Sequence, residues 1–201
     1  DRFIRLHPQH RNTDYAYYMR GLASFSKERS FLSSLLSIDN TNRDPGAAKD
    51  SLAQFSEFLT RYPKSPYAPD AQKRMIYLRN VLARYEIHVA NYYFKRGAYL
   101  AAANRGRFVV ENFQTTPAVP DALAVMTQAY YLLGRDELAQ STVKVLAANF
   151  PDHPALDKNG NFDRDYTYQF KRNDWLKYAT LGLLSKEETL GFDSQDIYNK
   201  Q

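Results

Sequence analysis

Two glycines, each at a turn between two helical patterns, constrain the fold of this chain more than any other feature. Residues 85–112 carry small and aromatic residues at helical spacing before Gly97, and a similar stripe resumes after it. A second copy follows, because Gly134 lies 37 residues after Gly97 in a comparable context. Glycine is otherwise scarce, so the turns that a β-rich chain needs are few. Two helical hairpins in tandem predict an all-α chain of stacked helix pairs.

The small and aromatic residues of these hairpins stand at fixed offsets. Ala90 and Ala102 allow the two helices of the first hairpin to approach closely, while Tyr93 fills the groove between them. In the second hairpin Tyr130 and Ala139 take the places of Tyr93 and Ala102. These offsets resemble the tetratricopeptide (TPR) repeat, a helix-turn-helix of roughly 34 residues. The resemblance implies helical hairpins stacked as a solenoid.

Some positions refine or depart from the TPR pattern. Pro151 stands where the repeat expects the proline that ends its second helix. Gly106 stands where a larger aromatic residue is usual. Neither glycine nor proline interrupts the chain between Pro69 and Gly97, which predicts one helix longer than an ordinary TPR helix.

The repeats suggest a division of the chain into an array and an extension. Residues 1–154 are expected to hold the end of one repeat and then three repeats, with an insertion at 27–44. The insertion is interpreted as a packed loop, and the alternative is a loop that contacts a partner. Residues 155–201 are expected to form a C-terminal extension with a short amphipathic helix at 171–185. The polar residues after 185 are expected to fray.

The composition limits which chemistries and which partners are possible for this chain. The chain has no cysteine, which removes disulfides, thiolate metal sites and cysteine nucleophiles. No apolar run is long enough to span a bilayer, and the first residues are expected to be the end of a helix in a fragment whose export signal or anchor lies elsewhere. The net charge of +5 favours acidic partners, which include nucleic acid, anionic lipid and acidic protein surfaces.

A search for chemistry finds no catalytic or metal-binding pattern. Residues 157–163 alternate like calcium ligands, but Phe162 replaces the required glycine and Tyr168 replaces the bidentate acid. The histidines lie far apart in the sequence, at His7, His10, His88 and His153. No nucleophile, base and orienting group can be nominated together. The sequence therefore predicts a protein that is not an enzyme and that uses no cofactor or metal.

Basic residues concentrate in the central repeat. Arg96 stands at the hairpin turn, and Arg105 lies three residues beyond Ala102, close to the packing face of the second helix. A planar guanidinium suits bidentate pairing with carboxylates of a partner, and a solvated helix surface is the alternative. The alternative is preferred for Lys73, Arg74 and Arg107.

The order of several segments resembles one family more closely than TPR proteins in general. The segments are DRFIRLHP, DYAYYMRGL, NRDPGAAKDSLAQF, RYPKSPYAPDAQKRMIYLRNVLARYE and YYFKRGAYLAAANR, within roughly residues 1–150. They resemble the BamD (YfiO/ComL) family, the TPR lipoproteins of the bacterial outer-membrane β-barrel assembly machine. The resemblance implies a C-terminal part of such a protein that lacks the first repeat. It also implies a scaffold at the periplasmic face of the outer membrane, anchored through an N-terminal lipid absent from this chain.

The same resemblance implies partners and site residues. Members of the family bind the membrane-proximal POTRA domain of BamA through C-terminal repeats. The matching residues here are Arg96 and Arg105, with Lys95 and Asn104 beside them. BamC and unfolded outer-membrane proteins are implied partners of the N-terminal repeats.

Two rival interpretations remain open from the sequence. Another periplasmic TPR coordinator would share phrases such as YPKSPYAPDA, but would lack the long helix and the insertion. A basic helical repeat that binds nucleic acid is suggested by the isoelectric point alone, and its binding would fall steeply with salt. No nucleic acid is expected as a partner under the preferred interpretation.

Overall fold

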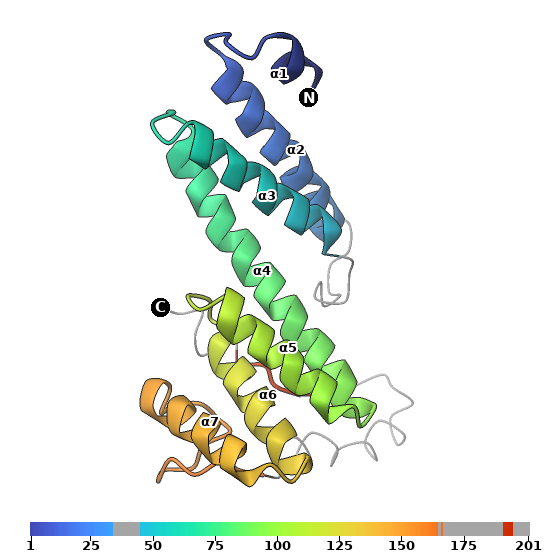
Figure 1. Cartoon of the computed structure of the whole chain (residues 1–201), viewed down its shortest axis with the longest axis vertical. Coiled ribbons are helices and arrows are strands. Elements are labelled where there is room, and N and C mark those ends of the chain that lie inside the picture. Colours follow the sequence, from blue (N-terminus) through green and yellow to red (C-terminus); the bar gives the residue numbers. More distant parts are fainter. Residues whose placement is uncertain (34–44, 165, 167–190, 195–201) are drawn as a thin grey trace. The chain divides into compact units, whose positions relative to one another are not determined.

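The computed structural model describes residues 1–33, 45–164, 166 and 191–194. These residues form helices and no strand, apart from an isolated antiparallel bridge between Leu156 and Phe162. The all-α prediction is therefore confirmed. The helices are α1 (Arg2–Leu6), α2 (Thr13–Ser33), α3 (Gly46–Arg61), α4 (Ala68–Lys95), α5 (Tyr99–Asn112), α6 (Val119–Leu132) and α7 (Asp136–Asn149) (Figure 1). None of the described helices is both long enough and apolar enough to cross a membrane.

The chain divides into two compact units, residues 1–85 and 86–201, and the boundary falls inside α4. In the first unit α2 packs against α3. Phe55 and Phe58 of α3 are completely buried, and the ring of Tyr18 packs against both. The Tyr18 hydroxyl donates a hydrogen bond to Asp70, and the guanidinium of Arg74 also donates to Asp70. That hydrogen bond lowers the pKa of Asp70. The Arg74 side chain is only 27% exposed in this ion pair, so Arg74 is not the fully solvated cation that the sequence suggested.

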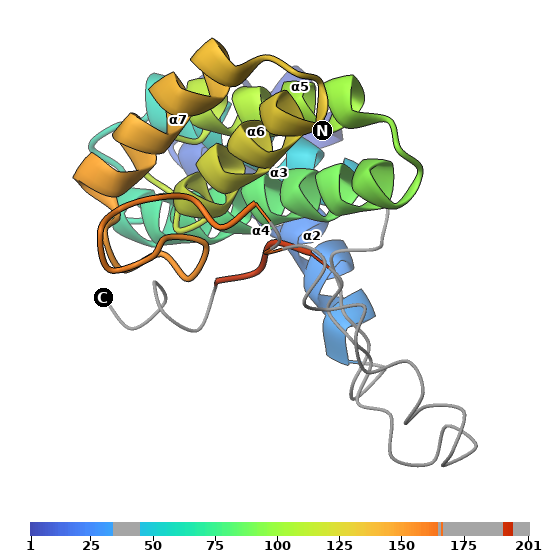
Figure 2. The same cartoon turned by 90° about the horizontal axis from the view of Figure 1, so that it is seen from below.

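In the second unit α5 packs against α6, and α6 packs against α7 (Figure 1). Ala103 of α5, Ala129 and Tyr130 of α6 and Ala139 of α7 form a buried cluster between these helices. Eleven of the 14 residues of α6 are buried. The remaining side of α6 is covered by the segment that follows α7, which returns past α6 (Figure 2).

The two glycine turns have the geometry that the sequence predicts. Gly97 and Gly134 have φ values of 70° and 66°, in the left-handed region that favours glycine. Each is followed by a residue whose N–H bonds back to the carbonyl of Tyr93 or Tyr130, and both glycine N–H groups bond three residues back. Both turns therefore end their helix with the same Schellman motif. The long helix is also confirmed, because α4 runs unbroken for 28 residues.

Other predictions agree with the structure only in part or lie outside the described residues. Helix α2 continues to Ser33, so the start of the expected insertion at 27–44 is helical and residues 34–44 lie outside the described residues. The expected helix at 171–185 also lies outside them. The division into an array over 1–154 and an extension over 155–201 stays a prediction. The expectation that the end of the chain frays is wrong for residues 191–194, where Phe192 and Ser194 are buried.

Candidate partner-binding site at the α4–α5 hairpin

The four residues implied by the resemblance all lie on the α4–α5 hairpin. Lys95 and Arg96 are exposed at the end of α4, and Asn104 is exposed on α5. The Cζ atom of Arg96 lies 5.3 Å from the ring centroid of Tyr92. No carboxylate among the described residues pairs with Arg96. Arg96 can therefore pair with a carboxylate of a partner protein that binds at this end of the hairpin.

Arg105 has a different environment from Arg96. Its Nη1 atom donates to Glu86 Oε2 at 3.0 Å, and the Glu86 side chain is only 6% exposed whereas that of Arg105 is 41% exposed. The Cζ atom lies 5.9 Å from the ring centroid of Tyr93. Burial acts to lower the pKa of Arg105, but hydrogen bonds with Glu86 and Tyr93 outweigh it and raise that pKa. Arg105 thus joins α5 to α4 and presents only part of its guanidinium to solvent.

Large apolar side chains surround the exposed charges of the hairpin. Leu100 and Phe108 of α5 are 60% and 43% exposed, and with Asn104 they follow the four-residue spacing of one helix face. Tyr92 of α4 is 49% exposed. We call this set the hairpin surface and define it as Tyr92, Lys95, Arg96, Leu100, Asn104 and Phe108.

The two helices contribute to the same side of the hairpin. Tyr93 and Arg105 face each other across the antiparallel pair. In antiparallel helices, the residues immediately before two facing positions project from the same side, since rotation and direction both reverse. Tyr92 and Asn104 are those residues. The hairpin surface is therefore one continuous face and not two opposite ones.

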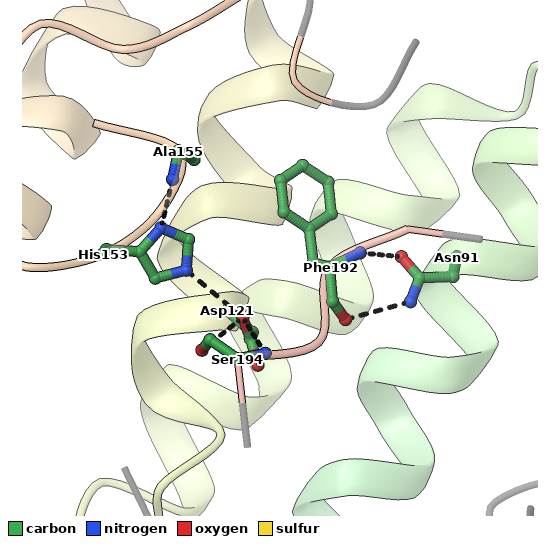
Figure 3. A network of polar contacts seen from close by, with 6 residues as sticks. All are labelled: Asn91, Asp121, His153, Ala155, Phe192 and Ser194. Carbon is green, nitrogen blue, oxygen red and sulfur yellow. Dashed lines mark hydrogen bonds and ion pairs between the residues drawn. The ribbon is translucent and has the colours of Figure 1, made fainter. Parts of the chain in front are cut away.

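A second polar cluster lies on α6 and was missed from the sequence. Asp121, His153 and Ser194 are all buried and hydrogen-bonded together, although Ser194 lies 73 positions after Asp121 (Figure 3). The Ser194 hydroxyl donates to Asp121 Oδ1 at 2.7 Å, and its N–H donates to the same carboxylate. No local spacing could have found the cluster, because its members come from α6 and two separate segments after α7.

The hydrogen bonds fix the tautomer of His153. The N–H of Ala155 donates to Nδ1 at 3.1 Å, so Nε2 carries the proton and donates to Asp121 Oδ1 at 3.2 Å. The Ser194 hydroxyl donates to the Asp121 carboxylate and not to the imidazole of His153, so these residues do not form the serine–histidine pair of a nucleophilic triad. The arrangement holds α6 and the two segments after α7 together.

Tyr166 adjoins this cluster, and its raised pKa makes the free energy of unfolding depend on pH in the alkaline range. Burial, with the charges of Asp121 and Asp193, raises the pKa of Tyr166 from 10.0 to about 12. Between these values the folded chain binds more protons than the unfolded chain, so the free energy of unfolding falls as pH rises. We expect a loss of about 2 to 3 kcal/mol that is absent below pH 10.

Urea unfolding at several pH values would measure this loss, with Tyr166→Phe as the comparison. The variant is expected to lose less stability than the wild type between pH 10 and pH 12. Parallel curves for the two proteins would show that Tyr166 does not titrate as described.

The polar loop after α7 is held by hydrogen bonds to Asp157. The Asp157 carboxylate accepts hydrogen bonds from the N–H groups of Asn159 and Asn161 and from the Asn161 amide. The bonds from Asn161, with that from Asn159, lower the pKa of Asp157. Across the described ranges, no three His, Asp or Glu side chains are placed to hold a metal ion.

The tandem helical hairpins and the exposed hairpin surface are typical of one class of protein. The chain is a helical-repeat protein of the TPR type, a class that presents stacked helices as binding surfaces. Residues 1–146 match the model of the YfiO family, described as an outer membrane lipoprotein. The chain belongs to this family.

Curated relatives agree with the family match. The outer membrane protein assembly factor BamD of Neisseria meningitidis serogroup A is 47% identical over 156 residues, which are 78% of this chain and 58% of the relative. The factors of the same name from Vibrio cholerae and Haemophilus influenzae are 39% and 34% identical over 149 residues, 74% of this chain and 62% and 57% of the relatives. The chain thus spans about 58% of the length of the Neisseria relative.

Proposed function

We propose that this chain is a non-catalytic scaffold in the assembly of outer-membrane proteins and that its hairpin surface binds the membrane-proximal POTRA domain of BamA. The family match and the relatives named as assembly factors support the general role. We place the whole protein at the periplasmic face of the outer membrane, anchored by a lipid on a part outside this chain. BamC and unfolded outer-membrane proteins remain predicted partners of the N-terminal repeats.

One observation carries the choice of the hairpin surface. Arg96 has no carboxylate partner in the described chain and stands beside exposed apolar side chains, of which Leu100 is 60% exposed. Arginine and aromatic residues at the centre of an apolar patch are the composition of binding hot spots. An acidic partner surface with apolar contacts would therefore fit here. Lys95 would lie at the rim, and Asn104 would lie between the exposed side chains of Leu100 and Phe108.

Arg105 would contribute in two ways. Its pair with Glu86 sets how α4 and α5 meet, and its exposed portion can face a partner carboxylate. Losing Arg105 would leave a buried carboxylate unpaired as well as removing a contact. Arg96 and Arg105 therefore need different controls in any binding experiment.

Site-specific photo-crosslinking tests the proposed interface. A photoreactive residue at Asn104, on the exposed face of α5, is expected to capture the POTRA domain of BamA in the assembled complex. The matched control is the same residue at Lys144, exposed on α7. Equal capture from both positions, or capture from Lys144 alone, would move the interface away from the hairpin surface.

A further inference from the structure

The segment Gly191–Ser194, which we call the strap, is bound by α4 and α6 in the way that a peptide ligand would be bound. It is extended chain that lies against the inner helices of two successive hairpins, α4 and α6 (Figure 3). The first helices of stacked repeats line the surface with which such proteins bind extended partners. We propose that this part of α4 and α6 is a binding site for an extended peptide that has glycine, an aromatic residue and serine at its first, second and fourth positions, and that the chain's own segment occupies it as a competitor. We call it the strap site, lined by Asn91, Phe94, Asp121, His153 and Tyr166.

The strap site recognises the peptide backbone through one amide. Asn91 Oδ1 accepts from the N–H of Phe192 at 3.1 Å, and Asn91 Nδ2 donates to the carbonyl of the same residue at 3.2 Å. This pair of bonds copies what a neighbouring strand would offer to an extended residue. Such contacts give affinity for any extended chain, so selectivity must come from the side-chain positions.

Contacts at the first, second and fourth positions select the side chain. Phe192 is fully buried, with ring centroids of Phe94 and Tyr166 at 5.7 and 5.4 Å. Gly191 has a φ of 129°, which L side chains rarely adopt, and a Cβ atom there would lie 2.2 Å from Asn91 Oδ1, so glycine is favoured at this position. The hydroxyl and the N–H of Ser194 both donate hydrogen bonds to the Asp121 carboxylate, whereas the side chain of Asp193 is exposed. The preferred pattern follows from these contacts.

Three of the five lining residues lie in the part of the chain that matches the family model, whereas His153, Tyr166 and the strap lie after it. Asn91, Phe94 and Asp121 lie within residues 1–146, which match the family, whereas Gly191–Ser194 lies beyond them. Gln128 stands two turns after Asp121 on the same face of α6, and its Oε1 atom is buried without a hydrogen-bond partner in the described chain. A buried acceptor left unsatisfied is costly, and a longer ligand could offer it a donor.

Peptide binding to the full chain tests this proposal. The probe is a fluorescein-labelled peptide with the sequence of residues 189–196, TLGFDSQD, followed by anisotropy. The full chain with Phe192→Ala is expected to bind it about tenfold or more tightly than the wild type, whose site is open only part of the time. A peptide with alanine in place of phenylalanine is the matched control and is expected not to bind.

A second variant keeps the test valid if Phe192→Ala does not fold. Gly191→Ala expels the strap through its clash with Asn91 and leaves every lining residue unchanged, so it too is expected to bind the peptide more tightly than wild type. Equal affinity for wild type and both variants, or no binding to a variant that keeps its helical circular dichroism, would overturn the proposal. A wild-type dimer that the peptide dissociates would make a second copy the occupant, and would also overturn it.

Discussion

Replacing Asp121 with alanine is expected to lower the free energy of unfolding by about 3 to 5 kcal/mol. The carboxylate is completely buried and accepts from His153 Nε2 and from both the N–H and the hydroxyl of Ser194. Alanine would leave these donors without an acceptor in a dry site. Release of the strap would return the Ser194 groups to water, which keeps the loss below the sum of three separate penalties.

Urea unfolding monitored by circular dichroism would measure this effect, with two comparison variants. Asp121→Asn retains one carbonyl acceptor and is expected to lose less than the alanine variant. Asp157→Ala removes a carboxylate that also accepts several hydrogen bonds but is exposed, and it is expected to lose the least. An Asp121→Ala chain as stable as Asp157→Ala would show that the buried cluster does not hold the second unit together.

Restoring the aromatic residue that the TPR pattern favours at Gly106 is expected to destabilise this chain by about 3 kcal/mol or more. A Cβ atom there would lie 2.7 Å from the carbonyl oxygen of Ala122 and 2.9 Å from Met126 Cγ. The first contact is with backbone, so α5 and α6 would have to separate. The gain of helix propensity of phenylalanine over glycine, less than about 1 kcal/mol, is too small to offset this.

Thermal and urea unfolding of Gly106→Phe would test the close approach, with Glu111→Phe on the exposed part of α5 as the matched control. The control is expected to change stability by about 0.5 kcal/mol or less. A Gly106→Phe chain at least as stable as wild type would mean that the helices separate more easily than their packing indicates.

Local features of the fold were predictable from the sequence. Gly97 and Gly134 mark turns because a positive φ is a property of single residues, and α4 is long because nothing between Pro69 and Gly97 interrupts a helix. The close approach at Gly106 was visible only as a departure from the TPR pattern. Its cause depends on how α5 meets α6, which no single segment encodes.

The candidate site was predictable in position but not in pairing. Arg96 and Arg105 could be chosen from charge and resemblance, yet Glu86 lies 19 positions before Arg105 and across the turn. Their pairing depends on the register of α4 against α5. Likewise, Arg107 is exposed as expected, but the sequence did not predict that its Nη2 atom donates to the Tyr130 hydroxyl at 3.0 Å. Such contacts across elements require the packed structure.

The most direct test of the account is titration of this chain into the isolated membrane-proximal POTRA domain of BamA, comparing wild type with Arg96→Ala, Arg105→Ala, Glu86→Gln and the α7 control Lys144→Ala. Arg96→Ala is expected to weaken binding about 30-fold or more without changing the fold, since truncating one partner of a desolvated charge pair costs roughly 2 kcal/mol or more. Glu86→Gln separates the effect of a disturbed hairpin from the loss of the Arg105 contact, and Lys144→Ala is expected to bind like wild type. Saturable binding that Arg96→Ala leaves unchanged would contradict the assignment of the hairpin surface as the docking site.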